Sequence, residues 1–539
     1  MQSAAASAGS AGRPGPRRPR GDARRCGARS LRRTARALVV AGIAAAALPC
    51  ALSEPVAAAP PDATPLEVFR EHFRDRDPKV RRQAVAQLAG VRGPAAVEAL
   101  VEALGDADER VRDTACEALR RNVRDAREIE ALAASGLRGR RVTTDVRRLT
   151  VRLLGDAGPA ASVELLSALS DRDAGVREAA ADALGSTGGE PAVRGLHELL
   201  ADREAPVRAA AIDALGRLTG ADAVGAAAAV LRGDRAVAPR VAAALVLAAH
   251  PRPESVEHLV AALRAPEWSV RVACARGLGA LGAHRDAARE AVAALVPALD
   301  AEPRLRVADE LAEALFLLTG IDFGPESARW NAWFTEAGRT FEPPAKPPRR
   351  SRPEAGGTHA DLLDLPTASD HVTFVLDGSH SMSDPVRFGV ETTKHDALLA
   401  AFERALERLP RAARANVIVF GSEPFPYRDE LFDATPAARR AAVKFLAKRA
   451  PDGRTNIYDS LTLALADPDV DTLVLVTDGA PSAGARTGRG DILEGLRALN
   501  RHRLVRVHTV EIGAANTGAR WRGFLRDIAE LTGGTYLER

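Results

Sequence analysis

The feature that most constrains the fold of this chain is an internal repeat of about 31 residues. A Val-Arg pair recurs with small variations, with Ala three residues and Leu seven residues after the Arg, and successive arginines are separated by 31, 35, 30, 31, 32, 31 and 33 residues. Self-similarity at this period predicts stacked units that bury their apolar faces against one another. The repeat arginines are Arg81, Arg112, Arg147, Arg177, Arg208, Arg240, Arg271 and, with a weaker match, Arg304, and the matching leucines are Leu88, Leu119, Leu154, Leu184, Leu215, Leu247, Leu278 and Leu311.

Each unit is predicted to contain two helices. Asp77 and Asp108 stand three residues before their Val, where a side-chain oxygen caps the second helix, and Pro78 suits a first helical turn. Gly185 and Gly216 follow the last Leu of their units, where we expect a left-handed residue that ends the helix. We interpret the recurring arginines as structural, each pairing with an acid of an adjacent unit.

The pattern Asp-Pro-x-Val-Arg-x-x-Ala resembles HEAT-like repeats of the short bacterial type, over about residues 63–320. The resemblance implies an all-α scaffold. The same repeat type occurs in phycobilin lyase subunits, but Cys116 and Cys274 fall at inward helix positions and are interpreted as small buried hydrophobic residues. Trp330 and Trp333 are expected to cap the end of the array, which places the solenoid at 63–338.

The first 50 residues differ sharply in charge from the rest of the chain. They contain ten arginines and one acid, Asp22, so the remaining residues carry 65 basic and 70 acidic side chains, a net charge of −5. A mildly acidic body argues against a nucleic-acid-binding function, which needs a basic surface.

The N-terminal segment 1–58 is typical of an export signal. An Arg-rich stretch to Arg36 precedes the apolar run Ala37–Leu48, and small residues follow. This 12-residue run is too short to span a bilayer of about 30 Å, so we expect signal cleavage, no stable membrane span and a periplasmic or secreted protein. The alternatives are twin-arginine export through Arg32-Arg33, a lipid anchor on Cys50, and either an Arg-rich tail on a cytoplasmic protein or a misassigned start of the chain.

A different pattern begins at about residue 367, after a linker at 339–366 that is rich in proline and basic residues. Short apolar runs alternate with helical stretches, which predicts a parallel sheet covered on both faces, with its ligand site beyond the carboxyl ends of the strands. The predicted strands are Val372–Leu376, Val417–Phe420, Leu473–Val476 and Val505–Ile512, and the predicted helices are 394–409, 436–449, 456–466, 489–500 and 520–531.

Polar residues collect at these strand ends. Asp377-Gly378-Ser379-His380-Ser381 follows the first predicted strand, Thr477-Asp478-Gly479 follows the third, and Thr455 lies at the start of a helix between them. Two carboxylates and three hydroxyls, without cysteine, match a hard divalent cation. Because hydroxyls carry no charge, this set leaves the cation under-neutralised and ready for one more carboxylate from outside.

These three motifs, in this order, resemble the von Willebrand factor A (VWA) domain over residues 367–539. The resemblance implies a metal-ion-dependent adhesion site in which Asp377, Ser379, Ser381, Thr455 and Asp478 are the ligands, Asp478 through water. Mg²⁺ is the expected ion, with Mn²⁺ and Ca²⁺ as alternatives. The predicted fold is therefore an all-α HEAT-like solenoid followed by an α/β doubly wound, Rossmann-like VWA domain.

Two residues depart from the usual VWA pattern. His380 and Arg454 stand where glycine is common; Arg454 places positive charge beside the expected metal and His380 adds one when protonated, which suits an acidic ligand group. Ser379 lies in Gly-Ser-His-Ser rather than in a nucleophile elbow, and no His-Glu-x-x-His helix occurs, so we expect no enzyme activity.

The two resemblances together imply an exported, non-enzymatic protein that binds a protein partner. The partner is expected to supply a carboxylate to the metal, and the solenoid to act as a scaffold or second binding surface. One alternative is an assembly or chaperone factor that works with a ring ATPase in the cytoplasm. A second is a lyase-type accessory enzyme that uses the solenoid groove. The sequence gives no indication of oligomeric state.

Overall fold

The structure is a computed structural model that describes residues 63–139, 141–338, 340–346, 348, 369–387, 391–513 and 521–539. The described residues all belong to one compact unit. The predicted export signal and most of the predicted linker lie outside the described residues.

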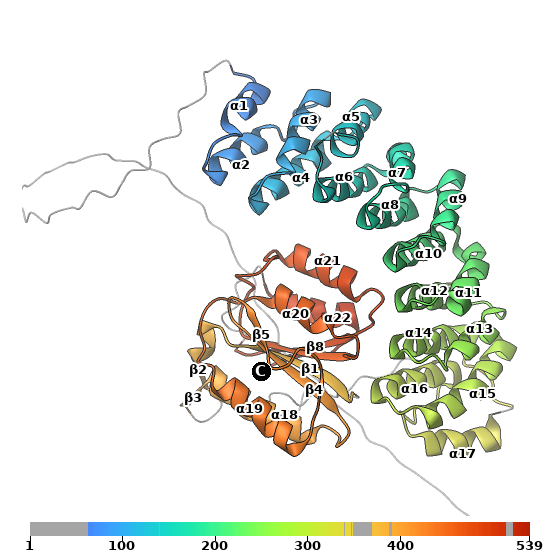
Figure 1. Ribbon diagram of the computed structural model, residues 1–539. Coiled ribbons are helices and arrows are strands. Elements are labelled where there is room, and N and C mark those ends of the chain that lie inside the picture. The colour runs from blue at the N-terminus through green and yellow to red at the C-terminus, as the bar shows by residue number, and fades with distance from the viewer. Residues whose placement is uncertain are drawn as a thin grey trace, which may run out of the picture. The chain divides into compact units, whose positions relative to one another are not determined.

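The repeat region folds into eight successive helical pairs among the described residues, as the periodicity predicts (Figure 1). Short 3-10 turns at Gly158–Ala161, Gly220–Ala223 and Ala280–Ala283 join some of the helices. The pairs are α1 (Pro65–His72) with α2 (Pro78–Gln87), α3 (Pro94–Ala103) with α4 (Glu109–Asn122), α5 (Ala126–Gly136) with α6 (Thr144–Asp156), α7 (Ser162–Ala168) with α8 (Ala174–Thr187), α9 (Glu190–Leu199) with α10 (Ala205–Thr219), α11 (Val224–Gly233) with α12 (Val237–Ala249), α13 (Ser255–Ala262) with α14 (Trp268–Gly279), and α15 (Arg285–Ala301) with α16 (Leu305–Thr319).

The repeat arginines form a ladder of ion pairs between neighbouring units, which confirms their structural role. From Arg81 to Arg271 each repeat arginine occupies the fourth position of the second helix of its unit. In six of the seven its guanidinium pairs with an acid of the following unit, while Arg112 donates to main-chain carbonyls of its own turn. The ladder pairs are Arg81–Asp106 (2.7 Å), Arg147–Asp171 (3.0 Å), Arg177–Asp202 (2.8 Å), Arg208–Asp234 (2.7 Å), Arg240–Glu267 (2.9 Å) and Arg271–Glu302 (2.8 Å).

The helix ends differ from the prediction at two glycines. Gly185 and Gly216 do not end their helices: α8 continues to Thr187 and α10 to Thr219, and the C-caps that follow, Gly188 (φ 40°) and Gly220 (φ 56°), have positive φ. At Gly185 the atoms nearest a Cβ would belong to the flexible Arg217 side chain, whereas Gly216 is a site of close helix packing, because a Cβ there would lie 2.7 Å from a methyl carbon of Val246. Glycine is therefore required there by a neighbouring helix and not by a left-handed turn.

The eighth repeat position was also predicted wrongly. Arg304 is the N-cap of α16, and Ala308 occupies the fourth helical position that the ladder arginines hold. The Arg304 side chain is directed elsewhere: it donates to the main-chain carbonyl of Asp469 (2.9 Å) and lies 5.7 Å above the ring of Trp268.

The end of the array is covered as predicted. Helix α17 (Ser327–Ala337) packs against α15, and the side chain of Trp330 is fully buried there. Trp333 lies edge-on to Trp330, with ring centroids 5.8 Å apart. One helical stretch among the described residues, Ala205–Gly233, is long and apolar enough to cross a membrane, but it consists of α10 and α11 within the solenoid, which is weak evidence for a span.

The α/β domain contains a mixed sheet in the order β5-β4-β1-β7-β8-β9, with β6 also pairing with β4. The four predicted strands are its parallel centre, and the additional β5 and β6 run antiparallel to β4. The strands are β1 (His371–Asp377), β4 (Arg414–Phe420), β5 (Pro424–Pro426), β6 (Phe432–Asp433), β7 (Thr472–Thr477), β8 (Arg506–Glu511) and β9 (Tyr536–Glu538), and a separate hairpin pairs β2 (Pro385–Arg387) with β3 (Glu391–Thr393).

Helices cover both faces of this sheet, which confirms the doubly wound prediction (Figure 1). Phe374 of β1 packs with Phe402 in the cluster on one face, whereas Val375 belongs to the cluster on the other. The first face is covered by α18 (Lys394–Arg408) and α19 (Pro436–Ala447), and the second by α20 (Ile457–Ala466), α21 (Arg489–Asn500) and α22 (Phe524–Thr532).

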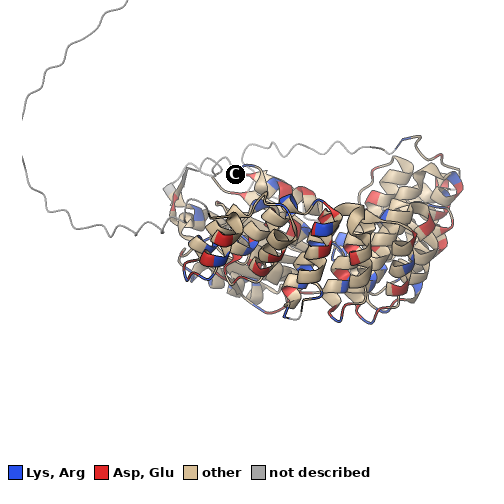
Figure 2. Ribbon diagram, turned by 90° about the horizontal axis from the view of Figure 1, so that it is seen from above, with Lys and Arg blue, Asp and Glu red and all other residues tan. Residues whose placement is uncertain are grey.

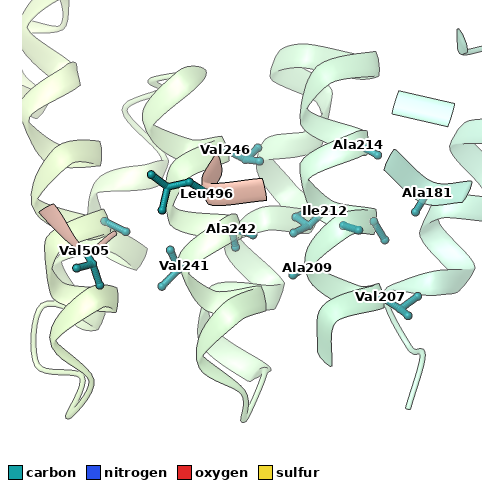
Figure 3. Close-up of a cluster of buried hydrophobic side chains, with 14 of the residues drawn as sticks. Ala181, Val207, Ala209, Ile212, Ala214, Val241, Ala242, Val246, Leu496 and Val505 are labelled. Atoms are coloured by element: carbon teal, nitrogen blue, oxygen red, sulfur yellow. The ribbon is translucent and has the colours of Figure 1, made fainter. Parts of the chain in front are cut away.

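The α/β domain packs against the inner helices of the solenoid within this compact unit. Leu496 of α21 and Val505, just before β8, belong to the same buried cluster as Val241 and Val246 of α12 (Figure 3). Ion pairs from the same segment surround the apolar contact. They are Arg501–Asp182 (2.7 Å), Arg501–Asp213 (2.7 Å) and Arg506–Asp309 (2.9 Å), and Nε2 of His502 also lies 2.7 Å from Oδ2 of Asp213. Basic and acidic side chains are interspersed along the helices in Figure 2.

Candidate functional site

The five predicted metal ligands lie at the carboxyl ends of β1 and β7 and at the start of α20. The two strands are adjacent and parallel, with Leu376 opposite Val476, so the turns that follow them lie side by side. Asp377 is the last residue of β1, and Asp478 directly follows β7. The sheet topology therefore places both predicted carboxylates at one edge, as expected for a doubly wound fold.

A chain of polar contacts connects four of the five residues. The main-chain N–H of Ser379 donates to Oδ1 of Asp377 (2.8 Å), and the hydroxyl oxygens of Ser379 and Ser381 are 3.2 Å apart. The hydroxyl of Ser381 in turn donates to Oδ1 of Asp478 (2.8 Å). All four side chains thus face one small region between the two strand ends.

Thr455 joins this group through the loop that precedes α20. Its main-chain N–H donates to Oγ of Ser482 (3.0 Å), which fixes the loop beside the turn after β7. A Cβ at Gly479 would lie 3.6 Å from the Thr455 hydroxyl oxygen and 4.0 Å from that of Ser381, so the two hydroxyls flank the same point. The structure therefore brings all five predicted residues together.

Asp377 is a buried carboxylate with weak compensation. Its side chain is fully buried, and its hydrogen-bond donors among the described residues, the N–H of Ser379 and the hydroxyl of Thr477, are uncharged. Burial raises the pKa of Asp377 to about 6, although these hydrogen bonds oppose the shift. A cation placed beside Asp377 would remove the cost of burying its charge.

Asp478 already has one cationic neighbour. The ammonium of Lys394, the first residue of α18, lies 2.5 Å from Oδ2 of Asp478 and 3.7 Å from Oδ2 of the exposed Asp384. Asp377 and Asp478 with Lys394 leave one net negative charge among buried groups, together with three hydroxyl oxygens. This donor set fits a hard divalent cation, whose preferred ligands are carboxylate and hydroxyl oxygens.

The outer side of the group faces solvent. Ser381 is half-buried, and His380 and Arg454 are exposed beside it. The guanidinium of Arg454 donates to the main-chain carbonyl of Ser482, so its charge is held along the rim. An incoming anion would meet positive charge before it reached the oxygen ligands.

Sequence reasoning missed two features of the domain. Lys394 is separated by 84 residues from Asp478, and no motif signals their contact. The second feature is a group at the opposite edge of the sheet, where Asp370, His371 and Asp471 present ligand atoms within 4.8 Å of one another. The three ligand atoms are close enough together to contact one metal ion, and the group is distinct from the predicted five residues.

Protein-family models match parts of the solenoid and almost all of the α/β domain. The model for HEAT repeats matches residues 66–141 and 140–216, and that for the PBS lyase HEAT-like repeat matches residues 270–301. The model for the von Willebrand factor type A domain matches residues 370–537.

Individual relatives align with only part of the chain. Human von Willebrand factor A domain-containing protein 3A is 30% identical over 121 residues, 22% of this chain, and mouse inter alpha-trypsin inhibitor heavy chain 4 is 30% identical over 132 residues, also 22%. The chain covers 10% and 13% of the length of these two relatives.

Two solved structures also align with part of the chain. A von Willebrand factor type A protein from Catenulispora acidiphila is 22% identical and covers 32% of this chain and 40% of its own, with a TM-score of 0.27. The structure of the complex of CpcE and CpcF of phycocyanin lyase from Nostoc sp. PCC7120 is 22% identical, and the alignment covers 46% of this chain and 98% of that chain, with a TM-score of 0.24. From the family matches, the chain carries HEAT repeats at residues 66–216 and 270–301 and a C-terminal von Willebrand factor type A domain at residues 370–537.

Proposed function

We propose that this is an exported, non-enzymatic protein that binds an acidic group of a partner protein through a divalent cation in its VWA domain. The presence of a VWA domain and HEAT repeats suggests protein–protein interaction. The observation that carries the finer proposal is the fully buried, weakly compensated Asp377 within a cluster of oxygen ligands at the strand ends. Export rests on the composition of the N-terminal segment.

The cation would be held by Asp377, Ser379, Ser381, Thr455 and Asp478, with Mg²⁺ as the expected ion. When bound, it supplies an electrophilic centre for a carboxylate from outside. The chain's own contribution is to fix the oxygens in advance: the N–H of Ser379 orients Asp377, and the hydroxyl of Ser381 orients Asp478. Preorganised ligands of this kind reduce the cost of ordering the site on binding.

Arg454 and His380 would select for acidic partners. Both are exposed at the rim of the cluster, where Arg454, and His380 when it is protonated, would attract a carboxylate without occupying the ligand positions. The Arg454→Gly variant is therefore expected to weaken partner binding and leave Mg²⁺ uptake intact. Equal partner affinity in the variant and the wild type would contradict this role of Arg454.

The test is selection of a displayed peptide library, and of proteins from a cell-envelope extract, on immobilised residues 59–539. Wild type, Asp377→Ala and the control Asp384→Ala, which changes an exposed acid near the cluster, are each compared with Mg²⁺ and with chelator. We expect enrichment of Asp- or Glu-containing ligands that require Mg²⁺, survive in Asp384→Ala and disappear in Asp377→Ala. Ligands retained by every variant with chelator would move the binding role to the solenoid and contradict the proposal.

A further inference from the structure

A group of three metal-ligating side chains lies at the amino end of the sheet, away from the proposed cation site. Asp370 and His371 stand at the start of β1, and Asp471 directly precedes β7. The Nδ1 atom of His371 is 3.1 Å from Oδ1 of Asp370, and one ligand atom of each of the three residues lies within 4.8 Å of the others.

The carboxylate of Asp471 has one oxygen without a hydrogen-bond partner among the described residues. Its side chain is fully buried. Oδ1 accepts hydrogen bonds from the hydroxyls of Ser369 (2.7 Å) and Thr472 (2.9 Å), whereas Oδ2 is buried and has no donor. A buried carboxylate oxygen without a proton donor is costly, so its position indicates a missing cationic or protic ligand.

The main chain holds the three residues in fixed positions. The N–H of Asp471 donates to the carbonyl of His371 (3.2 Å), and the N–H of Arg414 donates to the carbonyl of Asp370 (2.8 Å). These bonds continue the pairing of β1 with its two neighbours, so the ligand atoms are mounted on the rigid part of the domain. Sites on such elements keep their geometry before the ion arrives.

Asp370 and His371 also line a cavity of about 990 Å³ between the VWA domain and the solenoid. Trp268 and Arg304 line the same cavity from the solenoid side. The guanidinium of Arg304 is attracted by Asp471 but donates its hydrogen bond to the carbonyl of Asp469 (2.9 Å). An ion held by the three residues would therefore be reachable from the cavity and keep coordination positions open for a further ligand.

We propose that Asp370, His371 and Asp471 form a second cation site, which takes a divalent transition ion such as Zn²⁺. Imidazole is a common ligand of Zn²⁺ and unsuited to Mg²⁺, so the two sites of the domain differ in the ion that they select. Three protein ligands with an open position are typical of zinc sites that engage a further molecule. This inference does not depend on the proposed partner-binding function.

The test is titration of the full chain with ZnCl₂ by calorimetry, with Mg²⁺ present in excess. We expect one Zn²⁺ equivalent that is lost, or weakened at least ~tenfold, in His371→Gln and Asp471→Asn. The control His197→Gln, at an exposed histidine of α9, should keep the full affinity. Asp377→Ala should also keep it, because that variant alters only the other site.

Two results would overturn the assignment. One is a folded wild-type protein that takes up no Zn²⁺ equivalent. The other is unchanged stoichiometry and affinity in His371→Gln, whose half-buried side chain is the safer of the two sites to change. Circular dichroism of each variant ensures that loss of Zn²⁺ is not loss of fold, and if Asp471→Asn fails to fold, His371→Gln decides.

Discussion

The solenoid and the VWA domain both bury acidic side chains, but they compensate them differently. In the ladder, Asp202 pairs with Arg177 across two units, and both side chains are less than one-tenth exposed. At the strand ends of the VWA domain, Asp377 is fully buried and accepts hydrogen bonds only from uncharged donors among the described residues. We call a buried charge closed when it is paired with a counterion, as Asp202 is, and open when it has none, as at Asp377; the neighbouring Asp478 is paired with Lys394.

This difference separates structural charge from charge that can bind a ligand. In a buried ion pair with good geometry the carboxylate is already neutralised and gains little from a further cation. Removing one partner leaves the charge of the other uncompensated. A buried carboxylate that lacks a counterion would be stabilised by a cation bound beside it. We therefore expect that removing one member of a ladder pair destabilises the fold, whereas removing the charge of Asp377 stabilises it.

The largest effect is expected from Arg177→Met, which opens a closed pair. The variant leaves Asp202 buried without its guanidinium, so we expect the free energy of unfolding to fall by about 3–5 kcal/mol. Urea unfolding measures the change. Arg121→Met is the matched control: its pair with Glu117 is more than half exposed and is worth at most about 1 kcal/mol. Equal losses in the two variants would show that the ladder pair is not closed.

A somewhat smaller effect is expected at Glu310, which lies between Arg276 and Arg306 in the last unit. Burial raises its pKa, but the charges of Arg306 and Arg276 outweigh burial and lower the pKa of Glu310 to about 2. Because the folded pKa lies below the unfolded value, Glu310 stabilises the fold above pH ~4.5, and this contribution is lost as pH falls from there towards 2.

The Glu310→Gln variant should therefore lose about 3 kcal/mol of stability at pH 7 and should show a shallower decline between pH 4.5 and 2. Thermal or urea unfolding over that range measures both quantities. Glu290→Gln, at an exposed position of α15, should follow the wild-type curve. Parallel pH profiles for Glu310→Gln and the wild type would contradict the closed network.

At the open site the sign should reverse. Asp377→Asn removes a buried charge that has no counterion, so in metal-free buffer at pH 7 we expect the variant to be more stable than the wild type by about 1 kcal/mol. Mg²⁺ should raise the melting temperature of the wild type and not that of the variant. Asp384→Asn, an exposed change nearby, should respond to Mg²⁺ as the wild type does. If the metal-free Asp377→Asn protein is clearly less stable than the wild type, the charge of Asp377 is compensated in the metal-free fold and the site is not open.

The repeat was predictable because its signals are local. Asp77 at an N-cap and Arg177 one turn into a helix act within a few residues or on the adjacent unit, and periodicity exposes both. Gly216 was misinterpreted because glycine serves two purposes, a left-handed helix end and close packing, and the one-letter pattern is the same for both. Arg304 was misplaced because the last unit lacks an arginine at the ladder position.

In the VWA domain, Asp377 and Asp478 each follow a strand. The carboxyl ends of parallel strands lie at the same end of a sheet, so the position of this group could be predicted from the sequence. Lys394 could not, because its contact with Asp478 depends on how α18 is set against the sheet. His371 and Asp471 are 100 residues apart in sequence, and only the pairing of β1 with β7 brings them together.

The last effect is on ion affinity and not on stability: it tests whether the open site is partly closed by Lys394, and it rests on the proposed Mg²⁺ site. The Lys394 ammonium lies 2.5 Å from Asp478, where it competes electrostatically with a divalent ion. Lys394→Met should therefore raise Mg²⁺ affinity about tenfold, equivalent to ~1.4 kcal/mol, as measured by calorimetry. Lys444→Met, at an exposed lysine of α19, should leave the affinity unchanged. If Lys394→Met binds Mg²⁺ no more tightly, the ammonium and the cation do not share Asp478. The lysine would then belong with the closed pairs of the ladder and not with the open site.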